Sequence, residues 1–511
     1  MPDMLNPFVV NLRGGLVLNK SQFEMEPGEA MELRNFEPDI GGGYRRINGF
    51  TKFNTNAVTS GTTSGAVLMS AVYKDQVVAA RGTEVFKLSG TGSVSSIDSG
   101  RTSASRYDFD LYDMDGTERI IWADGANNAS HYNNSAVTDV SGTGAPANPK
   151  YVKIFKNHAV YGGMSATPQK IIFSAPYAVG DFSAANGAGS ISVTSTITGL
   201  KVFREQLYIF CEDAIFRLAG NSIADFQMQP VTTRIGCVAP FTIQEIGGDI
   251  VFLAADGLRT VAGTEKIGDV ELGVISRQIQ QRFTALDLSD VKNKMSSLVI
   301  RSKTQYRIFF ANQSSETDCT GIIGSFKGDP QAGHLGWEFA DIRGIKPNCS
   351  DSGFISDVET VVHGGHDGYI YKQESGNTFT NSSDSTLGVE ARYKSAHLTM
   401  GDPGIRKRFH RAILNYRPEG TIDTNLGLDY DFGSAEVLNP SSITITAASN
   451  TSVYGTGTYG SASYGGAQFV LERQPITGSG FAVSVQFTED TTSAPYSLRG
   501  FSLEFAAAGR R

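Results

Sequence analysis

A short apolar hairpin recurs along most of this chain, and it constrains the fold more than any other sequence feature. Each copy has a run of alternating or continuous apolar residues, a turn at Gly or Asp-Gly, and a second apolar run. Such runs on either side of a tight turn predict two antiparallel strands. The copies lie at residues 76–88, 119–132, 158–173, 207–218, 250–261 and 361–372, with a weaker copy at 306–313 and its partner at 322–326.

The spacing of the hairpins predicts how they assemble. Successive copies begin about 40 to 50 residues apart, and nearer about 60 around residues 273–295, which is the length of a four-stranded propeller blade. A single blade cannot bury both of its faces, so several blades must pack around a common axis. We therefore predict an all-β chain in which residues 51–387 form a β-propeller of six or seven blades.

The composition agrees with a chain of many short strands. The 511 residues include 57 glycines, and 19% are charged whereas 40% are apolar. This apolar content is too high for a disordered chain. The formal net charge of −8 argues against a general nucleic-acid binder, because such proteins carry a basic excess or a long basic stripe. Any contact with DNA is therefore expected to be local or transient.

Different sequence patterns flank the predicted propeller. Residues 1–50 are expected to form an irregular arm punctuated by glycines. From residue 388 longer strands replace the blade pattern, which predicts a second β domain of the sandwich type over residues 388–511. Residues 451–466 within it are rich in Gly, Tyr and Ser and predict an exposed loop. Its tyrosines suit contact with another chain, and an ordered hairpin tip without a partner fits equally well; they are Tyr454, Tyr459 and Tyr464.

One helix is predicted in this otherwise β sequence. Residues 273–284 place three apolar side chains on one helical stripe, with a serine near the start as a candidate cap. A second short helix is expected at residues 289–295. This helical insertion, about 273–295, either covers an edge of the propeller or meets a neighbouring subunit. The stripe consists of Ile275, Ile279 and Phe283, and the candidate cap is Ser276.

The sequence lacks the patterns that carry catalysis. It has no phosphate-binding loop, no HExxH helix, no GxSxG elbow and none of the Asp-box turns of propeller glycosidases. The pair His363 and His366 lies in a glycine turn without an identifiable third metal ligand. Asp113 and Asp115 begin like a calcium loop but lack the later oxygen ligands, so a hairpin turn is expected. The four cysteines form no CxxC pair and are expected to be scattered buried thiols. We predict no enzymatic activity, metal or cofactor.

One strong basic cluster lies at residues 406–411. On a strand the side chains alternate, so Arg406, Arg408 and His410 are expected to share a face. That face fits contact with an acidic neighbouring subunit or with phosphate in transit, and it fits equally the solvated charge of an edge strand. The candidate contact residues are Arg406, Lys407, Arg408 and Arg411.

A series of short motifs runs in order along nearly the whole chain. They are Asn11–Gly15, Tyr44–Arg46 with Gly49–Lys52, the hairpin Phe203–Leu218, Gly236 with Pro240 and Phe241, the strand 249–254, the helix 274–284 followed by SDVKNKM, the arginine-rich strand 405–417 and the terminal YSLRGFSLEF. In this order they resemble the tail nozzle proteins of podoviruses, which include the packaged-DNA-stabilisation tail accessory factors. Each motif is short and mostly structural, so the likeness depends on their order.

The resemblance implies a role in the virion. Members of this family form a homohexameric tube below the portal and its adaptor proteins, above the tail fibres or the tail tip or needle. They retain the packaged genome and then let double-stranded DNA pass. The resemblance implies a subunit of the virion tail, made in the host cytoplasm, and the sequence predicts no stable insertion into a membrane. An acidic protein suits a DNA channel, because Lys and Arg contacts with phosphate supply most non-specific affinity.

Two other classes of function remain open on the sequence. The first is a different propeller-bearing virion protein, such as a receptor-binding or fibre-attachment subunit. The second is a glycan-active propeller enzyme, against which the missing Asp boxes argue.

Overall fold

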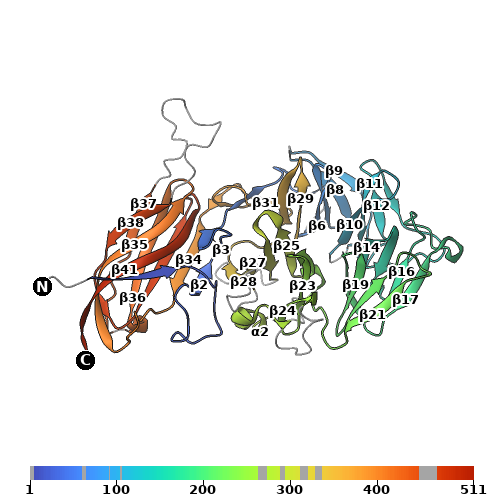
Figure 1. The fold of residues 1–511 in the computed structure, drawn as a ribbon. Helices are drawn as coiled ribbons and strands as arrows, with labels where there is room; N and C mark the ends of the chain where they lie inside the picture. The colour runs from blue at the N-terminus through green and yellow to red at the C-terminus, as the bar shows by residue number, and fades with distance from the viewer. Residues whose placement is uncertain are drawn as a thin grey trace.

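The computed structural model shows a β-propeller joined to a β domain of two facing sheets (Figure 1). The structure describes residues 5–59, 65–90, 92–103, 106–262, 273–287, 294–310, 320–327, 336–434, 436–447 and 469–510. Within these ranges helix is confined to short segments, and none is long and apolar enough to span a membrane. The predicted all-β class is confirmed.

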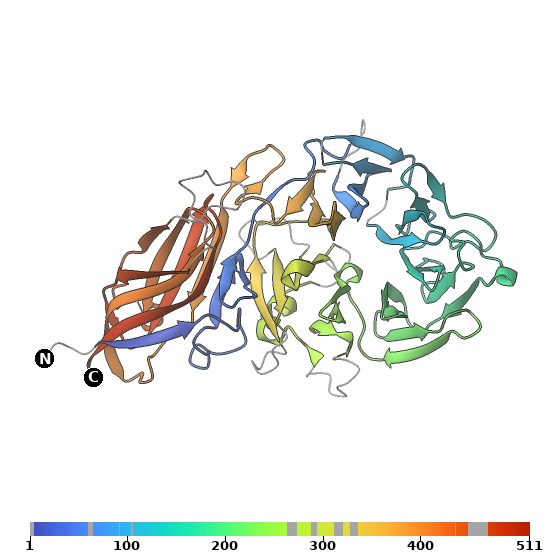
Figure 2. The same cartoon turned by 45° about the horizontal axis from the view of Figure 1, so that its top comes forward.

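The propeller is a ring of blade sheets around an axis (Figure 2). Six blades have four strands from the axis outward, and a further sheet has three among the described residues. The first two blades are β6 (Val67–Tyr73), β7 (Gln76–Arg81), β8 (Glu84–Leu88) and β9 (Val94–Asp98), then β10 (Asp108–Asp113), β11 (Glu118–Ala123), β12 (Ser130–Tyr132) and β13 (Val137–Asp139). The next two are β14 (Tyr151–Phe155), β15 (His158–Gly162), β16 (Lys170–Phe173) and β17 (Gly189–Ser192), then β18 (Ile197–Phe203), β19 (Gln206–Cys211), β20 (Ile215–Ala219) and β21 (Gln227–Thr232).

The remaining sheets complete the ring. The three-stranded sheet is β22 (Gln244–Ile246), β23 (Asp249–Ala254) and β24 (Gly257–Thr260). The sixth sheet around the ring is β25 (Ser296–Ile300), β26 (Gln305–Phe309), β27 (Gly321–Phe326) and β28 (Trp337–Ile342). The closing blade is β29 (Cys349–Ile355), β30 (Val358–Gly364), β31 (Ile370–Gln373) and β5 (Phe50–Lys52), extended by β32 (Phe379–Thr380) and β33 (Thr386–Leu387).

The ring is closed by strands from distant parts of the chain. The closing blade takes β29 to β31 from the end of the propeller sequence and β5 from before its first blade. Phe50 of β5 stacks on Phe379 with ring centroids 4.9 Å apart, and β29 packs against β6 of the first blade. Pairing the two ends of the repeat in one sheet leaves no open seam through which the ring could unwind.

Each hairpin predicted from the sequence is a strand pair of one sheet, central in six of the sheets and terminal in the three-stranded one. The seven pairs are β7–β8, β11–β12, β15–β16, β19–β20, β23–β24, β26–β27 and β30–β31. Strands such as β15 and β26 are buried at every position. Neighbouring blades cover both of their faces, which is why these strands read as continuous apolar runs rather than strict alternation.

The second domain consists of two β-sheets that face each other. Alternate residues of its long strands are buried, as expected when one face of each sheet meets the core. Phe409 of one sheet contacts Tyr430 of the other, with ring centroids 5.4 Å apart. One sheet holds β3 (Phe36–Pro38), β4 (Tyr44–Arg46), β41 (Tyr496–Arg510), β35 (Ile405–Pro418) and β38 (Val470–Pro475), with β1 (Asn6–Asn11) on β41 and β39 (Ser479–Gly480) on β35. The other holds β2 (Ala30–Arg34), β34 (Val389–Ser395), β40 (Val483–Thr491), β36 (Ile422–Tyr430) and β37 (Ile443–Ala447).

The predicted helix forms as a 3₁₀ turn, η4 (Arg277–Ile279), that leads into α2 (Gln280–Thr284). The stripe Ile275, Ile279 and Phe283 is buried as predicted. Ser276 does not cap the helix through its side chain; its hydroxyl instead accepts a hydrogen bond from the Leu258 N–H at 3.0 Å. The second predicted helix falls mostly outside the described residues. The other short 3₁₀ turns are η1 (Ala184–Asn186), η2 (Pro240–Thr242), η5 (Arg301–Lys303) and η7 (Asp431–Gly433).

Candidate functional site

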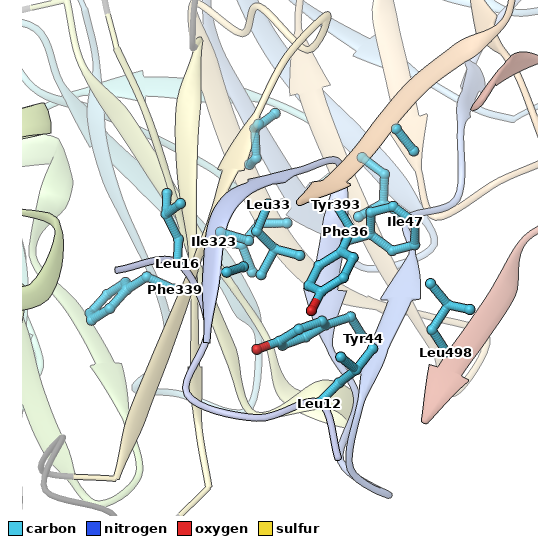
Figure 3. Close-up of a cluster of buried hydrophobic side chains, with 14 of the residues drawn as sticks. Leu12, Leu16, Leu33, Phe36, Tyr44, Ile47, Ile323, Phe339, Tyr393 and Leu498 are labelled. Atoms are coloured by element: carbon cyan, nitrogen blue, oxygen red, sulfur yellow. The ribbon is translucent and has the colours of Figure 1, made fainter. Parts of the chain in front are cut away.

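The N-terminal segment lies between the propeller and the two-sheet domain and joins them (Figure 3). Leu12 and Leu16 are buried in one hydrophobic core with Phe339 of the propeller and Tyr393 of the two-sheet domain. The Leu16 N–H donates to the Phe339 carbonyl at 2.7 Å. The sheet of the sixth blade also continues through β28 and β2 into the two-sheet domain. A shared core and a shared sheet hold the two parts together.

Gly15 shows how closely the segment approaches the propeller. Its φ is +68°, and a β-carbon at this position would lie 2.7 Å from the backbone nitrogen of Phe339. Its N–H donates to the hydroxyl of the buried Tyr44 at 2.9 Å, and that hydroxyl donates to the Gly28 carbonyl. Only glycine combines a left-handed conformation with this backbone contact at no steric cost.

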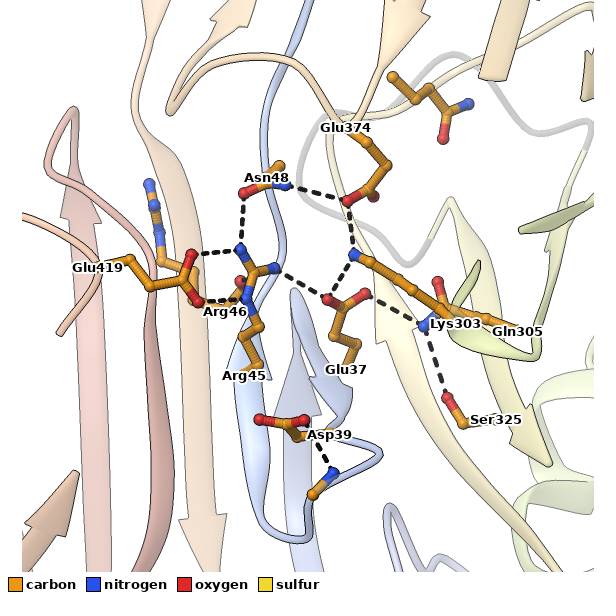
Figure 4. Close-up of polar contacts among 12 residues, drawn as sticks. Glu37, Asp39, Arg45, Arg46, Asn48, Lys303, Gln305, Ser325, Glu374 and Glu419 are labelled. Carbon is orange, nitrogen blue, oxygen red and sulfur yellow. Dashed lines mark hydrogen bonds and ion pairs between the residues drawn. The ribbon is translucent and has the colours of Figure 1, made fainter. Parts of the chain in front are cut away.

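A buried ionic network crosses the same joint (Figure 4). Glu37 on β3 accepts hydrogen bonds from Arg45 on β4 at 3.0 Å and from Lys303 of the propeller at 2.6 Å. Arg307 on β26, whose side chain is 1% exposed, donates to Glu37 at 3.2 Å and to Glu374 after β31 at 2.5 Å. Two propeller blades and the two-sheet domain therefore share one set of charges.

The charges of the network are mutually compensated. Burial raises the pKa of Glu374, but the nearby Arg307 and Lys303 outweigh it and hold that pKa well below its ordinary value. On the side of the two-sheet domain, Arg45 forms an ion pair with Glu419, with its Nε 2.6 Å from Oε1. Such a network fixes geometry, because removal of one partner leaves an uncompensated charge in a buried place.

Several motifs that carry the nozzle resemblance meet at this joint. Asn11–Gly15 forms the segment between the two parts, and Tyr44–Arg46 supplies Tyr44 and Arg45 to the contacts above. The helix motif docks there too, because Gln281 donates to the Leu18 carbonyl at 2.9 Å. The arginine-rich strand and the terminal strand are the paired β35 and β41 of the two-sheet domain. Residues of several of these motifs therefore contribute to the contacts between the two parts.

The inner strands of the propeller surround a cavity of about 550 Å³, and many of the side chains that line it are charged. Asp108 and Asp110 on β10 accept hydrogen bonds from the Val152 and Ile154 N–H groups of the next blade, at 3.0 and 2.8 Å. Asp351 on β29 accepts likewise from Val72 N–H on β6 at 2.8 Å. The innermost strand of each sheet has a free backbone edge, and these carboxylates satisfy part of it. Burial raises the pKa of Asp110 and of Asp351.

One arginine spans this cavity. Arg106 precedes β10 of the second blade, and its Nη1 donates to the Met295 carbonyl, just before β25 of the sixth sheet, at 2.9 Å. Its guanidinium carbon lies 4.1 Å from the centroid of the Phe241 ring. The second and sixth sheets are on opposite sides of the ring, so this side chain crosses the axis. A double helix cannot pass through the propeller itself.

The predicted basic cluster lies on β35 of the two-sheet domain. Arg408 is exposed and Arg406 is partly buried, both on the outer face as the alternation predicts. A β-bulge between Phe409 and Arg411 then shifts the alternation by one residue, so Arg411 also faces outward and pairs with Glu504 at 3.3 Å. Lys407 is buried, and its ammonium group donates to the Phe481 carbonyl at 3.0 Å. Its charged group is therefore bound within this chain.

The remaining residues singled out in the sequence are the histidine pair, the aspartate turn, the cysteines and the loop tyrosines. Those that the structure describes make contacts within the fold. His363 is buried and stacks on Tyr371 at 5.2 Å, and desolvation lowers its pKa to about 3, whereas His366 is exposed. Asp115 pairs with Arg119 at 2.7 Å in the β10–β11 hairpin, as the turn interpretation predicts. Among the described residues no cluster of three His, Cys, Asp or Glu side chains could hold a metal ion. Tyr454, Tyr459, Tyr464 and Cys319 lie outside the described residues, and Cys211, Cys237 and Cys349 are buried free thiols.

Sequence reasoning missed both the joint network and Arg106. Glu37 and Arg307 are 270 positions apart, and neither lies in a charge pattern that stands out. The signal that could have found the joint was the Tyr44–Arg46 motif, which places two arginines beside a buried tyrosine.

Comparison with known proteins gives only distant similarities to solved structures. No protein-family model matches the chain, and no curated protein matches it. Among solved structures, the computationally designed Ika8 protein is 12% identical, covering 62% of this chain and 99% of its own, with a TM-score of 0.35. PorZ, a surface component of the type-IX secretion system of Porphyromonas gingivalis, is 12% identical over 65% of this chain and 38% of its own, with a TM-score of 0.37. The Neurospora crassa Pan2 WD40 domain is 9% identical, covering 66% of this chain and 98% of its own, with a TM-score of 0.38.

Proposed function

We propose that this chain is a structural subunit of a short-tailed bacteriophage tail, which forms the nozzle that retains packaged DNA and conducts it during ejection. The observation that supports this role best is the extensive buried joint between the propeller and the two-sheet domain. A subunit of a ring that confines a packaged genome must hold a fixed angle between its parts. The buried network around Glu37 and the shared core around Leu16 supply that stiffness.

The geometry also constrains where DNA would pass. Because Arg106 crosses the propeller axis, a channel for duplex DNA would have to run between several copies of the chain. That arrangement is a closed ring with head-to-tail contacts, in which one surface of each copy meets a different surface of the next. The acidic net charge of −8 suits a lumen along which a polyanion slides.

The outer face of β35 is the surface that we propose for the contact between copies. Arg408 is exposed, and Arg406 has an Nε atom without a hydrogen-bond partner among the described residues. An acidic surface on a neighbouring copy would satisfy these guanidinium groups.

Oligomeric state tests the proposal. The purified chain, observed by native mass spectrometry and negative-stain microscopy, is expected to form rings of six. A chain that stays monomeric at high concentration and that cleaves or retains glycans would contradict it and support the glycan-active alternative.

A charge-reversal pair tests the proposed contact. The double variant Arg406→Glu and Arg408→Glu is expected to abolish rings while the monomer keeps its parent circular dichroism spectrum and melting temperature. The matched control is Arg234→Glu, at an exposed arginine in a propeller loop, which should assemble as the parent does. Normal rings from the double variant would remove β35 from the contact.

A further inference from the structure

The cavity at the centre of the propeller contains a buried positive charge that has no counter-charge among the described residues. Arg106 is 5% exposed, and none of the described residues forms an ion pair with it. Desolvation lowers the pKa of its guanidinium to about 10. The Cys349 thiol is a neighbouring group whose negative charge would raise the pKa of Arg106, but burial raises the pKa of that thiol and keeps it neutral. An isolated buried cation is costly, which calls for an anion at this position.

The guanidinium of Arg106 has N–H donors that are not used in hydrogen bonds to the described residues. Its Nη1 is used by the Met295 carbonyl, and its Nε is buried without a hydrogen-bond partner among the described residues. No hydrogen bond of Nη2 is found within the same residues. The Nε and Nη2 edge of an arginine is one of the forks that bind two oxygens of a carboxylate, phosphate or sulfate.

Two serine hydroxyls line the same cavity as Arg106 without a nitrogen or oxygen partner. Ser70 on β6 and Ser296 on β25 are each 1% exposed, and their Oγ atoms have no such partner in the described part of the chain. Ser296 directly follows Met295, whose carbonyl holds Arg106, and Ser70 lies beside Cys349. The Cys349 thiol is the neighbour that the Ser70 hydroxyl has within the described residues. Buried hydroxyls are almost always hydrogen-bonded, so two hydroxyls without an oxygen or nitrogen partner on the wall that also holds the guanidinium fit an oxyanion acceptor.

Three carboxylates of the cavity have other partners. Asp108, Asp110 and Asp351 accept backbone N–H groups of the adjacent blades, and Asp108 also pairs with Lys153 at 2.6 Å. None of them forms an ion pair with Arg106. Space is sufficient, because a cavity of about 550 Å³ is many times larger than a single small anion requires.

From these observations we propose that the central cavity of the propeller binds a small oxyanion, with the Arg106 guanidinium as its main ligand and the hydroxyls of Ser70 and Ser296 as further donors. The ligand class is a tetrahedral phosphate or sulfate, or a planar carboxylate. This site stands apart from the proposed tail role and depends only on the propeller. The bound anion would link the second and sixth sheets across the axis and so brace the ring.

Calorimetric titration tests the site. The full-length protein, dialysed free of phosphate and sulfate, is titrated with inorganic phosphate, sulfate and acetate at constant ionic strength, and its melting temperature is followed in parallel. Saturable binding of at least one anion is expected, together with a rise in melting temperature, because a ligand that binds only the folded state stabilises it. Comparing the affinities for phosphate and sulfate with the affinity for acetate shows whether the site prefers a tetrahedral oxyanion or a planar carboxylate.

Matched variants assign the binding to Arg106. Arg106→Met is expected to weaken binding by about tenfold or more and to abolish the rise in melting temperature. Arg119→Met is the control, because Arg119 belongs to the same blade, also lies over an aromatic ring and faces Asp115 outside the cavity. It should bind the anion as the parent does.

A second variant keeps the test decisive if Arg106→Met fails to fold. The pair Ser70→Ala and Ser296→Ala retains the arginine and should weaken binding by about threefold to tenfold. Parent-like binding in the folded Arg106→Met variant overturns the proposal, as does parent-like binding in the serine pair when the arginine variant does not fold. A parent protein that binds none of the three anions at tens of millimolar overturns it as well.

Discussion

The ionic network at the joint makes a quantitative prediction for Glu37→Gln. Glu37 is 2% exposed and accepts hydrogen bonds from Arg45, Lys303, Gln305 and Arg307. The amide keeps the size of the side chain but removes its charge, which leaves the buried guanidinium of Arg307 with one carboxylate where it had two. Breaking a buried charge pair in this way costs about 3–5 kcal/mol, so we expect the free energy of unfolding to fall by about that amount.

Urea unfolding followed by tryptophan fluorescence measures this loss. The chain has two tryptophans, and Trp337 lies on β28 beside the joint whereas Trp122 lies inside the second blade. We expect the midpoint seen by Trp337 to fall clearly in Glu37→Gln. The control is Glu205→Gln, where the same change affects an ion pair with Lys156 whose glutamate is 84% exposed, and no measurable shift is expected there. Equal midpoints for the two variants would refute a structural role for the buried network.

Three further changes probe other parts of the structure. Gly15→Ala should cost about 2 kcal/mol or more and make the N-terminal segment sensitive to limited proteolysis, because its β-carbon would clash with Phe339 at a positive φ. Phe50→Ala should destabilise the closing blade by about 3–5 kcal/mol in thermal unfolding, since Phe50 is 8% exposed and stacked. Burial raises the pKa of Glu489 from 4.5 to about 7 although Arg46 opposes it, so the folded state holds a proton that the unfolded state has lost, and stability from this group falls as pH rises through that window. The free energy of unfolding of Glu489→Gln, measured by urea titration, should therefore rise by about 2 kcal/mol relative to that of the parent between about pH 5 and 7. A difference between variant and parent that does not change with pH would contradict the reasoning.

The sequence by itself determined the repeated unit, the fold class and the buried helix stripe. The central strands of each sheet are covered on both faces, so their apolar runs are long and visible, as in residues 207–218. The inner and outer strands were harder to predict, because one edge or face of each meets solvent or the axis. β10 (DFDLYD) and β9 (VSSID), for example, have polar residues between their apolar ones and are mostly half-buried or exposed, so they lack the continuous apolar run that marks the central strands.

Only the tertiary structure decided how the ends of the chain are used. β5 enters the closing blade through backbone hydrogen bonds, which depend little on side-chain identity and leave almost no trace in the sequence. The bulge after Phe409 turns Arg411 outward by the same backbone means. The charge of Glu37 acquires a role only when folding brings Arg307 beside it from 270 positions away. Arg106 is unusual because folding removes water from it and, among the described residues, pairs it with no carboxylate. Local patterns record what a residue needs from its near neighbours, whereas the energy of a buried charge depends on which distant groups surround it.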